Sequence, residues 1–178
     1  MISLLVVLER EVSLEVGLVG CEGAVGAGEA LGNPATPLRA LVQREGGATR
    51  CSTERFRTEM KRSPALVLAV ERHTYASMAT AMQIAACNRS HLLAPRLARW
   101  LLMMRDRGAS DDLRLTQDLL AVMLGVQRAG VTLAASALQR RGMIQYSRGR
   151  MRILDPAALR ATACSCYEVI RRLHDGAG

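Results

Sequence analysis

Residues 116–142, TQDLLAVMLGVQRAGVTLAASALQRRG, decide the fold of this chain. Thr116 can cap the start of a first helix, and Gly125 can end it, because glycine accepts the positive φ of a helix terminus. A second helix is expected from Gln127 to about Arg140, with an inward apolar face made of Val131, Ala134, Ala135 and Leu138. Two helices joined by a short turn containing glycine are typical of the helix-turn-helix. The alternative is an ordinary pair of helices with a surface arginine.

The first turn of the second helix carries the residues that would read DNA bases. In a helix-turn-helix the second helix enters the major groove, and its first residues contact base edges. Arg128 can donate two hydrogen bonds to guanine, and Gln127 can bond adenine or a phosphate. Ala129 is small enough to allow a close approach and contact with a thymine methyl group. The predicted base-reading set is therefore Gln127, Arg128 and Ala129.

A basic β-hairpin is expected directly after the second helix. Residues 143–154 have two strand-like stretches with a turn at Ser147-Arg148-Gly149 between them. Arg148 and Arg150 stand at the tip of this hairpin, where cations can hold the phosphate backbone, and Arg152 is a third candidate. The helix-turn-helix is therefore predicted to be winged.

The charge of the chain is concentrated in this region. The whole sequence of 178 residues has 24 basic and 16 acidic side chains, a net charge of +8. Residues 93–154 alone hold 11 basic and 4 acidic side chains, which is almost the entire excess. Such clustering is typical of a protein that binds a polyanion, although a solvated basic face is the alternative. Aromatic residues make up only 3%, which argues against a surface that stacks single-stranded bases.

The first third of the chain is β-rich. Strand-like runs occur at 2–8, 13–19 and 39–43, separated by glycine-rich turns, and a short helix is expected at 52–61. Three or four short strands are too few for a closed barrel. The region is therefore interpreted as part of a barrel or sandwich whose earlier strands are absent.

A long helix is expected to begin at Ser63-Pro64, a good cap and first-turn pair, and to reach about His91. Its apolar residues recur every seven positions, which is typical of a helix that packs along another helix. The alternative is a core helix buried in its own domain. We predict contact between two copies of the chain through Leu68, Tyr75, Met78, Met82 and Ala85.

A further helix is predicted over 93–107 and a short strand at 113–115. Leu97, Leu101 and Met104 share one face of this helix, with Trp100 beside them. The arginines of the same helix are expected away from that face: Arg96, Arg99 and Arg105. One last helix is predicted over 157–173.

Together these elements predict an α+β fold in three parts. The β-rich region covers 1–62, the long helix 63–92 and the winged helix-turn-helix 93–178. No stretch of about 18 uninterrupted apolar residues is present, so a membrane span is not expected, and no export signal is recognisable.

Other chemistry is weakly indicated. The five cysteines are scattered and odd in number, which does not suggest a disulfide framework, and we expect reduced thiols in a cytoplasm. Cys164 and Cys166 form a weak zinc motif, because no second pair follows at a suitable spacing. His91 is expected to be an ordinary polar residue. The sequence therefore predicts no metal, no cofactor and no catalytic set, and an enzyme is not expected.

Several segments together resemble the Crp/Fnr superfamily of bacterial transcription regulators. The resemblance spans about 1–175 and is most specific in the segments Cys87-Asn88-Arg89, Arg96–Leu102, Leu115-Thr116-Gln117, Met123–Val126 and Ser147–Arg150. It implies a homodimer with a cyclic-nucleotide-binding-like β-roll, a long dimerisation helix and a C-terminal winged helix-turn-helix. Measured against that family, the first half of the β-roll is missing, so an N-terminally truncated chain is expected.

The resemblance also assigns roles to residues. Thr116, Gln117 and Asp118 match positions that contact the DNA backbone, while Gln127, Arg128 and Ala129 match the base-reading start of the recognition helix. Arg148 and Arg150 match the wing tip. The familiar family pattern has Glu where this chain has Ala129, and Arg where it has Leu133, so the preferred operator should differ.

The sensor region departs further from the family pattern. The turn at Gly20–Gly23 resembles the phosphate-binding turn of the family, but Cys21 stands where the family has its ribose-binding Glu. Tight binding of cyclic AMP is therefore not expected.

The function expected from sequence is a sequence-specific regulator that binds near-palindromic double-stranded DNA as a homodimer, with RNA polymerase as an implied partner. The alternative is a protein-interaction or dimerisation module that uses its winged helix without reading DNA. Salt distinguishes the two, because only DNA binding releases counterions and weakens steeply as salt rises.

Overall fold

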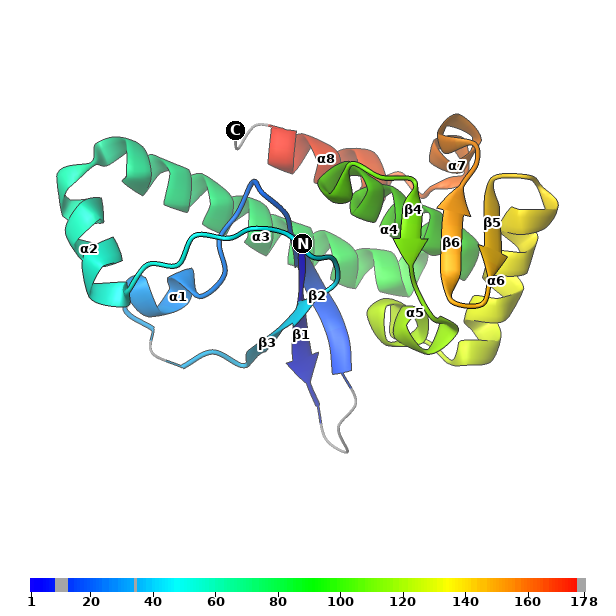
Figure 1. The fold of residues 1–178 in the computed structure, drawn as a ribbon, viewed down its shortest axis with the longest axis horizontal. Coiled ribbons are helices and arrows are strands. Elements are labelled where there is room, and N and C mark those ends of the chain that lie inside the picture. The colour runs from blue at the N-terminus through cyan, green and yellow to red at the C-terminus, as the bar shows by residue number, and fades with distance from the viewer. Residues whose placement is uncertain (9–12, 34, 176–178) are drawn as a thin grey trace.

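The computed structural model describes residues 1–8, 13–33 and 35–175. Its N-terminal part contains a small antiparallel sheet (Figure 1). β1 (Ile2–Val7) lies between β2 (Ser13–Val19) and β3 (Leu38–Val42). The three predicted strands are confirmed. β3 is exposed along its whole length, so the sheet covers the rest of the molecule mainly through β1 and β2.

A helix of 27 residues, α3 (Pro64–Ser90), connects the two ends of the molecule (Figure 1). The short helices α1 (Ala27–Ala30) and α2 (Thr53–Arg62) precede it. The hydroxyl of Ser63 accepts a hydrogen bond from the amide of Leu66, and Pro64 occupies the first turn, as the sequence predicts. At 1.5 Å per residue α3 is about 40 Å long, enough to contact both the N-terminal sheet and the C-terminal helices.

The C-terminal part is a winged helix-turn-helix. It contains α4 (Leu93–Gly108), β4 (Asp112–Arg114), α5 (Gln117–Leu124), α6 (Arg128–Arg140), β5 (Ile144–Ser147) and β6 (Arg150–Ile153). The strands form a second antiparallel sheet in the order β4-β6-β5. α4 packs against α6 and also against the helices that follow the wing.

The prediction of one last helix over 157–173 is wrong. The segment forms two helices, α7 (Pro156–Thr162) and α8 (Cys166–Asp175). The chain leaves the helical conformation at Ala163 (φ −62°, ψ 148°), and the amide of Cys164 donates to the carbonyl of Pro95 at 3.3 Å. This tie to α4 turns the chain so that α8 packs along α3.

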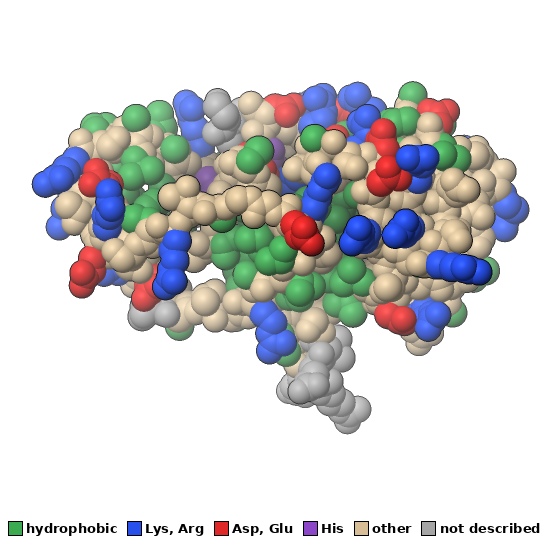
Figure 2. Space-filling view, in the orientation of Figure 1, with side chains coloured by type: hydrophobic (Ala, Val, Ile, Leu, Met, Phe, Trp, Pro, Cys, Tyr) green, Lys and Arg blue, Asp and Glu red, His purple; other side chains and the backbone are tan. Residues whose placement is uncertain are grey.

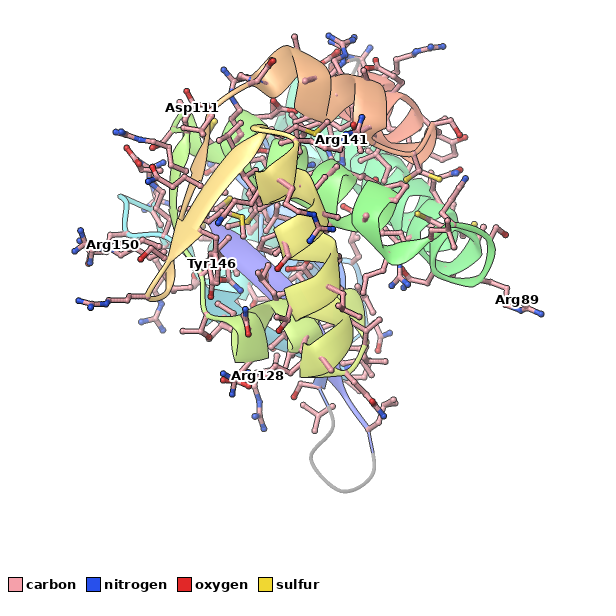
Figure 3. The ribbon with its side chains drawn as sticks, turned by 90° about the vertical axis from the view of Figure 1, so that its right-hand side faces the viewer. Arg89, Asp111, Arg128, Arg141, Tyr146 and Arg150 are labelled. Atoms are coloured by element: carbon pink, nitrogen blue, oxygen red, sulfur yellow. The ribbon has the colours of Figure 1, made fainter. Side chains whose placement is uncertain are left out.

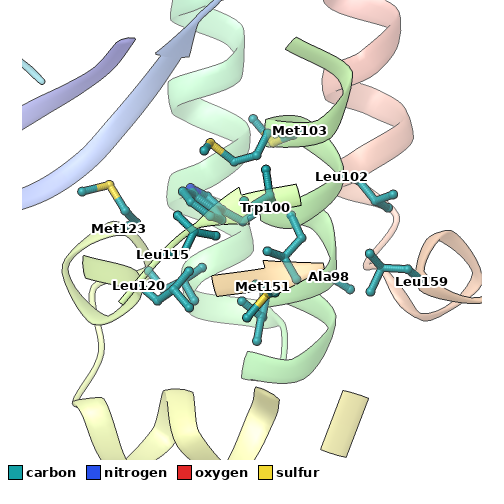
Figure 4. Close-up of a cluster of buried hydrophobic side chains, with 14 of the residues drawn as sticks. Ala98, Trp100, Leu102, Met103, Leu115, Leu120, Met123, Met151 and Leu159 are labelled. Atoms are coloured by element: carbon teal, nitrogen blue, oxygen red, sulfur yellow. The ribbon is translucent and has the colours of Figure 1, made fainter. Parts of the chain in front are cut away.

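The centre of the core is α4, which is buried on nearly all sides (Figure 4). Trp100 is 1% exposed and Leu101 is fully buried, and one continuous apolar cluster joins them to residues of both sheets. Arg96 and Arg99, which the sequence places away from this apolar face, are nevertheless buried: they are 7% and 2% exposed. The apolar periodicity identifies one packed face of α4, but helices and strands cover its other faces too.

A buried carboxylate links the N-terminal sheet to α4. Glu15 on β2 accepts hydrogen bonds from the indole nitrogen of Trp100 at 2.7 Å and from the hydroxyl of Ser3 at 2.5 Å. Burial raises the pKa of Glu15 to about 7, because desolvation outweighs these two hydrogen bonds and the nearby charges of Arg99 and Arg107. The contact between the two parts of the molecule therefore depends on a group that titrates near neutrality.

The stability of the protein is expected to fall as the pH rises from about 4.5 to about 7. In this window the folded state holds a proton on Glu15 that the unfolded chain releases, so raising the pH favours unfolding, by about 3 kcal/mol in total. Glu15→Gln, which keeps the hydrogen-bonding shape without the charge, should flatten the profile. Urea unfolding of both proteins at several pH values measures this, and equal slopes would contradict the assignment.

Among the described residues, no single helix is long and apolar enough to cross a membrane. α5 and α6 reach the required apolarity only when taken together, and they meet at an angle of 104°.

Candidate nucleic-acid interface

The turn between α5 and α6 has the geometry of a helix-turn-helix. The two helices meet at 104°, within the range of about 90–120° that is typical of this motif. Gly125 ends α5 with φ 63° and ψ 45°. The amide of Gly125 donates to the carbonyl of Val122, and the amide of Val126 donates to the carbonyl of Ala121. These two hydrogen bonds give partners to carbonyls in the last turn of the helix. The glycine is thus required by the backbone, as predicted.

The start of α6 is exposed and carries Arg128, whose side chain lies near the start of α5 (Figure 3). The Nε of Arg128 lies 3.5 Å from the side-chain oxygen of Gln117, and one terminal nitrogen lies 3.4 Å from Asp118. Gln117 also accepts a hydrogen bond from the hydroxyl of Thr132 at 2.9 Å. Residues at the start of α5 therefore orient the side chain that is predicted to reach the bases.

The wing is a tight hairpin fixed against the start of α5. Arg148 and Gly149 both have positive φ, 47° and 76°, as a two-residue hairpin turn requires. The carbonyl of Gly149 accepts from the amide of Leu115 at 2.9 Å, directly before the helix cap Thr116. The wing tip and the start of α5 consequently form one continuous surface, and Arg150 extends from it away from the body of the domain (Figure 3).

Sequence reasoning missed one cation of this surface. Arg114 on β4 lies directly opposite Arg150 on β6, and both side chains are exposed. Like charges in this position repel each other, and a phosphate between them would relieve the repulsion. The alternation of the short strand that contains Arg114 could have indicated its outward direction, but not which strand it would pair with.

Arg152, the third phosphate-binding candidate on the wing, already has a carboxylate partner. It forms a bidentate ion pair with Asp112, with nitrogen–oxygen distances of 2.8 and 3.1 Å, and these hydrogen bonds lower the pKa of Asp112. A shallow hollow on this face of the sheet is lined by Arg114, Arg148, Arg150 and Arg152. Figure 2 shows several basic side chains over this end of the molecule.

The predicted dimer residues lie together on the outer face of α3. Large apolar side chains there are well exposed: Leu68 46%, Tyr75 62%, Met78 49% and Met82 63%. Ala85 is exposed as well. The opposite side of α3 is buried through Val70, Ala76, Thr80, Ile84 and Cys87. One face of α3 is therefore buried within the molecule, as the alternative interpretation expects, while the other face is exposed.

The hollow between the N-terminal sheet and α3 is mostly apolar. Its described lining includes Leu4, Leu38 and Ala40 from the sheet and His73 from α3. No Lys or Arg belongs to that lining among the described residues.

A helix-turn-helix followed by a β-hairpin that packs beside it defines the class of winged helix-turn-helix proteins. Within that class, residues 95–162 match the Crp-like helix-turn-helix domain. The matched segment runs from the start of α4 to the end of α7, so it contains both helices of the motif and the wing.

Solved structures show that the rest of the chain follows the same fold. A putative regulator of the Crp/Fnr family from Eubacterium rectale has a TM-score of 0.70 at 17% identity, over 90% of this chain and 76% of that one. A CRP/FNR-family regulator from Thermus thermophilus has a TM-score of 0.69 at 21% identity, over 91% and 82%. FixK2 from Bradyrhizobium japonicum has a TM-score of 0.66 at 12% identity, over 92% and 83%.

These similarities confirm the α+β fold and the resemblance to Crp/Fnr regulators that the sequence indicates. No curated protein sequence matches the chain.

Proposed function

We propose that this protein is a sequence-specific DNA-binding transcription regulator that binds near-palindromic operators as a homodimer. The observation that carries the proposal is the exposed start of α6 with Arg128, on the same side of the domain as three outward arginines: Arg148 and Arg150 on the wing and Arg114 on β4. A regulator bound in this way would meet RNA polymerase, which is the further partner that we propose.

The phosphate contacts come from the wing and from the start of α5. Arg114, Arg148 and Arg150 supply the cations. The first amides of α5 point out of the helix and favour an anion. The hydroxyl of Thr116 accepts a hydrogen bond from the amide of Leu119. The amides of Gln117 and Asp118 are then left to bind a phosphate. The carboxylate of Asp118 would repel that phosphate, so we assign it to holding Arg128.

Base reading comes from the first two turns of α6. Arg128 would donate to guanine, with Gln127 and Ala129 beside it, as the sequence predicts. Leu133 is 73% exposed one turn further along the same helix. An apolar side chain in this position suits a thymine methyl group. We therefore expect operators with a guanine and a thymine in each half-site.

The dimer would form through the exposed apolar face of α3. Side chains at heptad spacing on a long helix are typical of a parallel or antiparallel helix pair, and the second copy of this chain presents the same face. The two recognition helices would then contact successive major grooves about 34 Å apart.

Arg128→Ala is expected to lower specific affinity by about 1–3 kcal/mol and to leave most of the nonspecific affinity, because the lost contact is to a base. The measurement is fluorescence anisotropy with a selected operator and with scrambled DNA. Arg140→Ala, at the far end of the same helix, is the matched control. Equal losses on both DNAs would show that Arg128 does not read bases.

A further inference from the structure

A cluster of metal-binding side chains lies where α3 meets the C-terminal helices. The sequence shows Cys164 and Cys166 without a second pair nearby, but the fold supplies one. Cys87 and His91, one turn apart at the end of α3, lie against the α7–α8 junction. All four ligand atoms lie within 4.8 Å of one another.

We propose that Cys87, His91, Cys164 and Cys166 bind one zinc ion. Zinc prefers four thiolate and imidazole ligands in a tetrahedron, and three Cys with one His is a common structural set. Zinc–sulfur bonds of about 2.3 Å place two ligand atoms of a tetrahedron about 3.8 Å apart. The Sγ atoms of Cys87 and Cys164 are 3.4 Å apart, and the Sγ of Cys166 is 3.7 Å from the Nδ1 of His91.

The short distances between the ligand atoms fit a single metal ion and not an iron–sulfur cluster. An iron–sulfur cluster interposes several atoms between its ligands and needs its sulfurs farther apart than these. The three cysteines are 0%, 7% and 2% exposed and His91 is half-buried, so the site is closed to substrates. A closed four-ligand site of this kind is structural.

A second, independent observation is the buried positive charge beside the cluster. Arg99 is 2% exposed, and its charge acts on both Cys87 and Cys164. Its Nε has no hydrogen-bond partner, one terminal nitrogen donates to the sulfur of Met103 at 3.2 Å, and among the described residues it forms no ion pair with a carboxylate. A buried charge is costly unless it is compensated. Three thiolates with one Zn²⁺ carry a net charge of −1, which would balance Arg99.

The site also has an outer partner. The side-chain amide of Gln83, on the preceding turn of α3, donates to the Sγ of Cys166 at 3.0 Å. Donors of this kind orient metal ligands and stabilise their negative charge. The ion would thus be held by Cys87 of α3, by His91 directly after that helix and by two residues of the α7–α8 junction. It would fix the winged domain against α3.

The experiment measures zinc in the full chain, purified without a histidine tag in reducing buffer. Atomic emission should find one zinc per chain, and cobalt added to the metal-free protein should give the visible spectrum of tetrahedral thiolate coordination. His91→Ala and Cys166→Ser should lose the metal, with near-ultraviolet circular dichroism reporting on the fold. Cys21→Ser and Cys51→Ser, which remove exposed thiols, should keep it.

Gln83→Ala gives a graded test that does not remove a ligand. Its zinc affinity, measured by competition with a coloured chelator, should be about 10–100-fold lower. The proposal is overturned if the metal-free chain binds neither zinc nor cobalt. It is overturned equally if peptide mapping finds a Cys87–Cys164 disulfide in a protein that takes up no metal.

The consequence for DNA rests on the proposed function. Removal of zinc should weaken operator binding, because the winged domain is then no longer fixed to α3. Zinc content and the cobalt spectrum are measured without DNA. A protein that binds zinc but no DNA would therefore contradict the proposed function and leave the metal site supported.

Discussion

Aspartates at the centre of the exposed face of α3 are expected to convert the protein into a monomer. The double variant Met78→Asp and Met82→Asp would place two carboxylates in an apolar helix–helix contact, where unpaired charges cost several kcal/mol each. A monomer holds one half-site only, so operator affinity should fall by roughly 1000-fold or more. Sedimentation measures the mass, and fluorescence anisotropy measures the affinity.

The control for this variant is Val169→Asp, which adds one carboxylate at an apolar side chain on α8 that is 42% exposed. It should leave both mass and affinity unchanged. A double variant that stays dimeric would show that another surface forms the dimer. A monomeric variant with undiminished operator affinity would show that DNA binding does not require the dimer.

DNA binding is expected to weaken steeply with salt. Three outward arginines per protomer, Arg114, Arg148 and Arg150, give six phosphate contacts in a dimer, and the slope of log K against log salt should be about −5. Between about 50 and 200 mM salt the affinity should fall by roughly 1000-fold. Titration of a labelled operator at several salt concentrations measures this slope.

Removing two of these cations tests where the phosphates bind. Arg114→Gln with Arg150→Gln should make the slope shallower by about 3–4, because four contacts are lost in the dimer. Arg62→Gln with Arg72→Gln removes the same charge from α2 and α3 and should leave the slope unchanged. An unaltered slope in the first variant would place the DNA on another surface. A slope near zero in the unmodified protein would favour the protein-interaction alternative.

The helix-turn-helix could be predicted because its signals are local. Thr116 caps its helix, Gly125 has the positive φ that its place requires, and the hairpin turn lies where glycine follows Arg148. Each depends on a few neighbouring residues whose conformational preferences are strong. The exposed stripe on α3 was also predictable, because heptad spacing places its residues on one face.

The features that the sequence did not predict depend on contacts between distant segments. The burial of Arg99 follows from elements that cover every side of α4, which the periodicity of one helix cannot indicate. The exposure of Arg114 beside Arg150 depends on strand pairing. The meeting of Cys87 with Cys164 requires α8 to fold back along α3, which follows from the break at Ala163.

Selection of bound sequences from a random DNA pool, at about 150 mM salt where nonspecific contacts are weakened, tests the central proposal most directly. The full chain should enrich a two-fold symmetric motif whose half-sites lie about one helical turn apart, with a guanine in each. The Arg128→Ala protein, selected in parallel, should lose the preference for that guanine. Recovery of no motif, or of one without two-fold symmetry, would contradict a dimer that reads DNA through α6.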